Sequence, residues 1–154
     1  MATRSEEVKR GHVCVMNADL RILVVDTFEP FRRAICSWLR EKGFHVMEAT
    51  DGLEAVEKAI ELQPDVVLFD IGLPNLNGIE SAKQVRSLVP SAKVVFVTQE
   101  SSSDLIREAL RLGARGYIHK ENASSDLLPA IDAILSGQRF VSSTLGFIVD
   151  VECA

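Results

Sequence analysis

The sequence predicts an α/β fold: a five-stranded parallel sheet, doubly wound, with helices on both faces and the strand order 2-1-3-4-5. Short apolar runs recur along the chain, and segments with helical spacing of apolar residues separate them. Three of the runs are almost continuous Val, Ile, Leu and Phe, which is typical of parallel strands buried on both faces. Right-handed crossovers between such strands leave few topologies, and the doubly wound order is the one we expect.

Each of the five predicted strands is an apolar run flanked by polar or turn-forming residues. Their bounds are Arg21–Asp26, Phe44–Ala49, Asp65–Asp70, Lys93–Thr98 and Gly116–His119. The regular alternation of these runs with helical segments indicates five strand–helix units in one sheet.

Five helices are predicted from apolar residues spaced three or four apart. Their apolar stripes are Phe31, Ile35, Trp38 and Leu39; Leu53, Val56 and Ile60; Ile79, Ala82, Val85 and Leu88 or Val89; Leu105, Ile106, Ala109 and Leu112; and Leu127, Leu128, Ile131, Ile134 and Leu135. Polar residues that cap helices stand at several starts, and Gly or Pro follows the ends. The predicted caps are Asp51–Gly52, Ser101–Ser103 and Ser124–Ser125, and the predicted stops are Gly43, Pro90, Gly113 and Gly137.

A chain of 154 residues suits one domain with short ends. We expect the domain at residues 20–143, a flexible extension at 1–19, and a tail or the start of a linker at 144–154. The chain is either a stand-alone domain or one part of a longer protein.

Composition excludes several classes of function. The net charge is −5, from 17 basic and 22 acidic residues, which disfavours direct nucleic-acid binding by this chain. The longest purely apolar stretches are four residues, so no membrane span or signal peptide is expected. The three cysteines have no CxxC spacing, which favours a reduced, cytoplasmic location without a zinc site or disulfide framework.

Four polar residues follow predicted strands at one edge of the sheet: Asp26, Asp70, Thr98 and Lys120. In doubly wound folds ligands bind at this edge, near the point where the strand order reverses. Two carboxylates about 4 Å apart repel by about 4 kcal/mol at an effective dielectric constant near 20, so they need a cation, a shared proton or a lysine between them. Oxygen ligands suit Mg²⁺, whereas a hydroxyl and an ammonium suit phosphoryl oxygens. The set therefore predicts metal-assisted phosphoryl transfer to a carboxylate.

Each of these residues also has a simpler interpretation. Asp26 is suited to capping the following helix, Thr98 to forming a turn, and Lys120 to lying solvated in a loop. A purely structural role is a poorer explanation of Asp70, because four apolar residues lead directly into it. Their shared position at strand ends favours a common site.

Residues 20–143 strongly resemble the receiver domain of bacterial two-component response regulators, the CheY-like proteins with a flavodoxin-like fold. The similarity lies in Arg21–Asp26, in Pro64–Glu80, in Val94–Thr98 and in Gly113–Lys120. The absence of Pro after Lys120 and the segment that follows are similar to the branch that carries LuxR-type output domains in transcription regulation.

The resemblance implies a role for each site residue. Asp70 would accept the phosphoryl group from a sensor histidine kinase, and Asp26, through a water, Asp70 and the backbone carbonyl of Gly72 would hold Mg²⁺. Thr98 and Lys120 would bind the phosphoryl group, and Tyr117 would be an aromatic switch. The face built by the fourth helix, fifth strand and fifth helix would serve output or homodimerisation, provided that Leu105, Ile106, Arg111 and Tyr117 expose enough apolar surface.

Two residues depart from the family pattern. Thr27 stands where the family usually has a second acid, which weakens the expected Mg²⁺ site because a hydroxyl is a poorer ligand than a carboxylate. Glu29 is a weak candidate to replace that acid. Gln99 stands where a small residue is usual, and its side chain either narrows the entry to Asp70 or offers a donor.

Two functions remain open on the sequence. The first is a phosphorylatable receiver, a signalling switch and not an enzyme in the ordinary sense. The alternative is an atypical receiver with weak or no phosphorylation that acts as a protein–protein interaction module. A flavin or nucleotide enzyme on the same fold is a more remote possibility, since neither common glycine-rich phosphate-binding motif is present.

Overall fold

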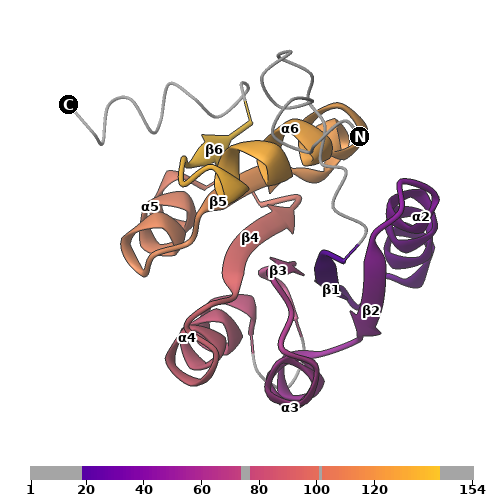
Figure 1. Cartoon of the computed structure of the whole chain (residues 1–154). Helices are drawn as coiled ribbons and strands as arrows, with labels where there is room; N and C mark the ends of the chain where they lie inside the picture. Colours follow the sequence, from indigo (N-terminus) through magenta and orange to yellow (C-terminus); the bar gives the residue numbers. More distant parts are fainter. Residues whose placement is uncertain (1–18, 74–76, 101, 143–154) are drawn as a thin grey trace.

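The computed structural model describes residues 19–73, 77–100 and 102–142. They form a parallel sheet in the order β2-β1-β3-β4-β5-β6, which confirms the predicted order and adds a strand (Figure 1). The strands are β1 (Arg21–Val25), β2 (His45–Ala49), β3 (Val66–Phe69), β4 (Lys93–Thr98), β5 (Gly116–His119) and β6 (Phe140–Val141).

The sixth strand corrects the prediction of five. Strand β6 pairs parallel to β5, with Phe140 beside Gly116 and Val141 beside Tyr117. Two residues are too few to show a period in the sequence, and the strand forms only because the fold places this segment along the free edge of β5. The buried Ser142 hydroxyl accepts the His119 N–H (3.1 Å) and donates to Asp126 (2.8 Å), which fixes the end of the strand.

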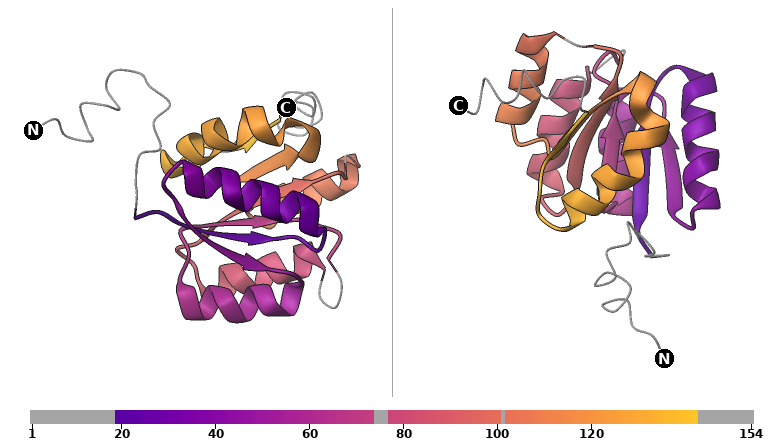
Figure 2. Two further views of the ribbon diagram at one scale, coloured as in Figure 1. Left: turned by 90° about the vertical axis from the view of Figure 1, so that its right-hand side faces the viewer. Right: turned by 90° about the horizontal axis from the view of Figure 1, so that it is seen from above.

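Five α-helices and a short 3₁₀ turn complete the fold. They are α2 (Glu29–Glu41), α3 (Gly52–Leu62), α4 (Gly78–Leu88), α5 (Ser103–Arg111), η1 (Lys120–Asn122) and α6 (Ala123–Leu135). Helices α2 and α6 cover one face of the sheet, and α3, α4 and α5 cover the other (Figure 1, Figure 2). Successive residues of β1 alternate between the two cores, since Leu23 packs with α3–α5 and Val24 packs with α2 and α6. This alternation explains why the strands are apolar throughout.

The helix caps were predicted in part. The Asp51 side chain accepts the Glu54 N–H at 2.8 Å and caps α3, as expected. The prediction for α6 was wrong: the helix begins at Ala123, and Ser124 and Ser125 lie within its first turn. The chain enters it through η1, where His119 Nδ1 accepts the Glu121 N–H at 3.3 Å. Ser102 precedes α5 without a side-chain capping bond.

The expected extension at 1–19, except Asp19, and the expected tail at 144–154 lie outside the described residues, as do Cys14 and Cys153. Cys36 is fully buried, and burial raises the pKa of its thiol to about 12. Within the described part of the chain, no helix is both long enough and apolar enough to cross a bilayer.

Candidate functional site

The four polar side chains predicted at the strand ends form one connected cluster. Lys120 Nζ lies 2.7 Å from Asp26 Oδ2 and 3.3 Å from Asp70 Oδ2. The Thr98 hydroxyl donates to the other carboxylate oxygen of Asp70, Oδ1, at 2.8 Å. Strands β1, β3, β4 and β5 are neighbours in register, so their carboxyl ends bring these side chains together. The structure therefore places the predicted residues in one cluster.

Asp26 is the buried carboxylate of the cluster, with 2% of its surface exposed, and Thr98 is buried as well. Asp26 accepts the Phe28 N–H at 2.8 Å and so orders the turn that leads into α2. It does not cap the helix as its simpler interpretation suggested, because the N-cap residue of α2 is Phe28 and no side chain caps that end. Burial raises the pKa of the Asp26 carboxyl, and the Asp70 charge adds to this, whereas Lys120 and the Phe28 N–H act in the opposite direction. The folded chain therefore holds the Asp26 proton more tightly than the unfolded chain does.

This raised pKa predicts a pH dependence of stability that Asp26→Asn removes. Because the pKa of Asp26 is higher in the folded chain, its stabilising contribution is present below the unfolded pKa and is lost as the pH rises through the folded pKa. In metal-free buffer, Asp26→Asn should therefore become more stable relative to the native chain as the pH rises from about 4 to about 7. Chemical denaturation across this range measures the difference.

Asp104→Asn is the matched control, because the Asp104 side chain is 92% exposed and lies on α5, outside the cluster. It should leave the pH profile of stability unchanged. An Asp26→Asn profile parallel to that of the native chain would contradict the assignment of Asp26 as a buried, raised-pKa carboxyl.

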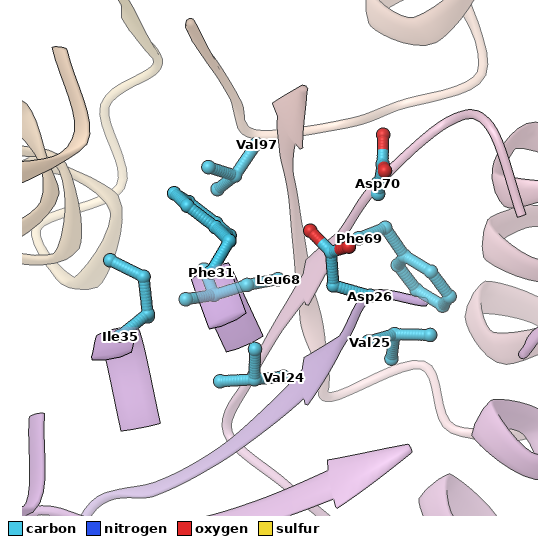
Figure 3. A pocket seen from close by; sticks show the side chains of 9 residues that line it. All are labelled: Val24, Val25, Asp26, Phe31, Ile35, Leu68, Phe69, Asp70 and Val97. Atoms are coloured by element: carbon cyan, nitrogen blue, oxygen red, sulfur yellow. The ribbon is translucent and has the colours of Figure 1, made fainter. Parts of the chain in front are cut away.

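The Lys120 ammonium also contacts an aromatic ring, that of Phe31. Lys120 Nζ lies 4.6 Å from the centre of the Phe31 ring, a distance at which a cation is attracted to the ring face. Figure 3 shows Phe31 beside Asp26 over a small apolar cavity, also lined by Ile35, Leu68 and Val97. The sequence placed Phe31 only in a helix stripe. Its contact with Lys120 could not be predicted, because it depends on how α2 packs over the sheet.

An open pocket gives access to Asp70. Its lining residues are Thr27, Phe28, Glu29, Asp70, Gly72, Gln99 and Lys120. The Thr27 hydroxyl donates to the Thr50 carbonyl at 2.8 Å, so its proton is committed to the backbone. Glu29 lies at the exposed rim and pairs with Arg33 at 3.5 Å. Gln99 lines the same pocket.

The donor set fits a Mg²⁺ ion with several waters. The carboxylates of Asp26 and Asp70 converge on the same cationic nitrogen, so their oxygens can converge on a metal cation. The Gly72 N–H donates to Asp70 Oδ1 at 3.3 Å, which places the Gly72 backbone beside the same carboxylate. Among the described residues, no cluster of three or more His, Cys, Asp or Glu could hold a metal. Mg²⁺ commonly keeps several waters and takes one or two carboxylates, which suits this set.

A hydrogen-bonded chain leads from Asp70 to Tyr117. The Thr98 hydroxyl donates to Asp70 and accepts the Glu100 N–H at 3.3 Å. The Glu100 carbonyl accepts the Tyr117 hydroxyl at 2.9 Å. Tyr117 is fully buried and packs in a series with Phe96 and Phe69, and burial raises the pKa of its phenol. A change at Asp70 can therefore reach the β4–α5 segment and Tyr117 through contacts that are already formed.

The face predicted for output or dimerisation is less apolar than the sequence suggested. Ile106 and Tyr117 are fully buried, so neither contributes exposed apolar surface. Leu105 is partly buried, and Arg111 is exposed. Strand β6 lies along β5, so the face consists of α5, β5 with β6, and α6.

Comparison with known proteins identifies the family of this chain. The model of the response regulator receiver domain family matches residues 22–132. The chain is 39% identical over 120 residues to the transcriptional regulatory protein LnrK of Bacillus subtilis (strain 168), covering 77% of this chain and 54% of that protein. It is 34% identical over 115 residues to the chemotaxis protein CheY of Thermotoga maritima, covering 74% of this chain and 96% of CheY. The chain thus spans about half the length of LnrK but nearly the whole of CheY.

Solved structures show the same relationship. A two-component response regulator of the LuxR family from Aurantimonas sp. SI85-9A1 has a TM-score of 0.80 at 32% identity, covering 87% of this chain and 97% of that one. A CheY-like receiver domain protein from Methanospirillum hungatei JF-1 has a TM-score of 0.74 at 31% identity, covering 78% and 96%. The family match, the identities and the shared fold together place this chain in the response regulator receiver domain family of two-component signalling.

Proposed function

We propose that Asp70 accepts a phosphoryl group from a phosphohistidine of a sensor histidine kinase. The observation that carries the proposal is the pair of contacts on one carboxylate: Thr98 Oγ1 lies 2.8 Å from Asp70 Oδ1, and Lys120 Nζ lies 3.3 Å from Asp70 Oδ2. A hydroxyl donor and a fixed positive charge beside a nucleophilic carboxylate are the groups that phosphoryl transfer requires.

In the transfer, an Asp70 carboxylate oxygen attacks phosphorus, the P–N bond to the kinase histidine breaks, and a P–O bond forms. The Lys120 ammonium offsets negative charge on the phosphoryl oxygens, and the Thr98 hydroxyl donates a hydrogen bond to them. Lys120 is held for this role by Asp26 on one side and by the Phe31 ring on another. This holding reduces the reorganisation needed when the phosphoryl group arrives.

Mg²⁺ would be held by Asp26, Asp70 and the Gly72 carbonyl, with waters in the remaining positions. When bound, it supplies charge neutralisation for the phosphoryl oxygens. Because Thr27 stands at the position of the usual second acid, only two carboxylates serve the ion, and its affinity should be lower than in a site with three.

The phosphoryl group would act as a switch. It adds about −1.5 to −2 charge, which draws the Thr98 hydroxyl toward it and away from its present geometry. The Glu100 backbone and Tyr117 then respond through the bonds that join them to Thr98. We propose that the face of α5, β5 with β6, and α6 carries the signal to an output partner or a second copy of the chain.

The second candidate is an atypical receiver that binds partners without efficient phosphorylation. The observation that favours it is Thr27, whose hydroxyl donates to Thr50 and leaves the site with two carboxylates.

One titration separates the two candidates. Beryllofluoride, which imitates an aspartyl phosphate, is added with Mg²⁺, and the backbone amide signals of Gly72, Thr98 and Lys120 are followed by NMR. We expect saturable shifts in the native chain and about tenfold tighter apparent Mg²⁺ affinity in Thr27→Asp, since a carboxylate replaces a hydroxyl. Ser37→Asp, which adds the same charge at an exposed position of α2, should change neither.

The outcomes assign the function. Shifts in the native chain support the phosphorylatable receiver. Shifts in Thr27→Asp alone support the atypical receiver. Their absence from both chains would contradict the phosphoacceptor assignment of this cluster.

A further inference from the structure

A second charged site lies at the opposite edge of the sheet from Asp70. Four basic residues line one cavity of about 360 Å³: Arg86, Lys93, Arg115 and Arg139. They come from four segments, because Arg86 lies near the end of α4 and the other three lie at the amino ends of β4, β5 and β6. These strands run side by side in one direction, so their amino ends share an edge (Figure 1).

The cavity is positive in an otherwise acidic chain. No carboxylate among the described residues lines it, although the chain carries a net charge of −5. Nor does any of the four basic side chains form an ion pair within the described part of the chain. Asp65 is hydrogen-bonded to Lys93 through the backbone, since its carbonyl accepts the Lys93 N–H at 2.9 Å. Its carboxylate, however, accepts the Arg21 N–H at 2.8 Å.

Two of the arginines are held in place by the end of a helix. Arg86 Nη1 donates to the Leu112 carbonyl, and Arg139 Nη2 donates to the Leu110 carbonyl at 3.0 Å. Leu110 lies in the last turn of α5 and Leu112 is its C-cap residue, and cationic side chains commonly bind carbonyls at this end of a helix. Capping accounts for Arg86 and Arg139 but not for Lys93 and Arg115, and each capping guanidinium keeps further N–H donors.

We propose that this cavity binds a compact, multiply charged oxyanion of the phosphate or diphosphate type, either free or as the head of a small molecule. Several guanidinium groups and one ammonium around a concave site match such an anion, since arginine donors fit its oxygens in pairs. A volume of about 360 Å³ lies within the range of small-ligand sites. A long polyanion fits poorly, because the net charge of −5 would repel it beyond the cavity.

The proposal is tested by titrating the full chain with pyrophosphate, without Mg²⁺ and at constant ionic strength, and following backbone amides by NMR. We expect saturable shifts of Lys93, Gly113 and Arg115 that weaken as salt is added. The double variant Lys93→Gln, Arg115→Gln should bind pyrophosphate about tenfold or more weakly, since two charge-assisted contacts are lost. Neither residue caps α5, and a thermal melt verifies that the variant folds.

The double variant Arg33→Gln, Lys42→Gln is the matched control. It removes the same charge from α2 and its C-cap residue, and it should change the affinity by less than about twofold. Parallel titrations with ATP and a short single-stranded oligonucleotide separate the sources of the anion: ATP at least as tight as pyrophosphate supports a nucleotide-like ligand, and pyrophosphate tighter than ATP supports the free anion. Tighter binding of the oligonucleotide, shifts confined to Thr98 and Lys120, or equal losses in both double variants would overturn the proposal.

Discussion

Replacing Lys120 by Met is expected to lower the unfolding free energy by about 3 kcal/mol at about pH 7 and to slow phosphorylation of Asp70 about a hundredfold. The methionine keeps an apolar stem against Phe31 but removes the cation shared by Asp26 and Asp70. Asp26, with its side chain 3% exposed, would then be a buried carboxylate without a counter-ion. The loss of stability should shrink as the pH falls, since burial raises the pKa of Asp26 and its carboxyl takes up a proton more readily.

Chemical denaturation measures the stability, and transfer from a small phosphoryl donor measures the rate. The double variant Asp26→Asn, Lys120→Met should recover most of the stability, because it removes the buried charge together with its partner. Lys42→Met is the control for removing a positive charge from a lysine beside an aromatic ring, because Lys42 follows α2 and contacts Trp38. Native stability and native phosphorylation in Lys120→Met would show that the lysine does not hold the cluster together.

Gly78→Ala is expected to destabilise the chain by about 1–3 kcal/mol and to impair phosphorylation as well. A methyl group on Gly78 would overlap the backbone carbonyl oxygen of Asp70 and lie 2.7 Å from Ile71 Cα. Gly78 also donates its N–H to the Ile71 carbonyl at 2.9 Å, so the start of α4 packs directly against the strand end that carries Asp70. Backbone cannot move aside as a flexible side chain can, so the methyl must displace either α4 or Asp70.

Gly72→Ala is the matched control for this prediction. It lies two residues from Asp70, but a methyl there meets no atom within 4 Å. Thermal unfolding should therefore separate the two variants, with Gly78→Ala unfolding at a clearly lower temperature and Gly72→Ala close to native. Equal melting temperatures for Gly78→Ala and the native chain would mean that the close approach of α4 to Asp70 is not a constraint on the fold.

The sheet order could be predicted from the sequence because each long strand is a distinct apolar run. Val66–Phe69 is apolar at every position and leads directly into Asp70, which marks both a buried strand and its polar end. The positions of Asp26, Thr98 and Lys120 followed from the same rule, since parallel strands share an edge. Strand β6 gave no such signal, because its two residues become a strand only through pairing with β5.

The contacts within the site were less predictable than its composition. Phe31 lies on Lys120, and the Thr27 hydroxyl bonds the Thr50 carbonyl, through packing between segments distant in sequence. The predicted start of α6 was wrong because a 3₁₀ turn at Lys120–Asn122 leads directly into the helix, which begins before the two serines. Tyr117 was chosen by resemblance, and its bond to the Glu100 carbonyl shows how it can be linked to Thr98.

The most direct measurement is the intact mass of the chain after incubation with Mg²⁺ and acetyl phosphate. The native chain should gain one phosphoryl group, Asp70→Asn should gain none, and Asp65→Asn should behave as native. Asp65 is the fitting control because it lies at the other end of the same strand, where its carboxylate accepts the Arg21 N–H. A phosphoryl adduct that persists in Asp70→Asn would contradict the account, because Asp70 would then not be the residue that Thr98 and Lys120 serve.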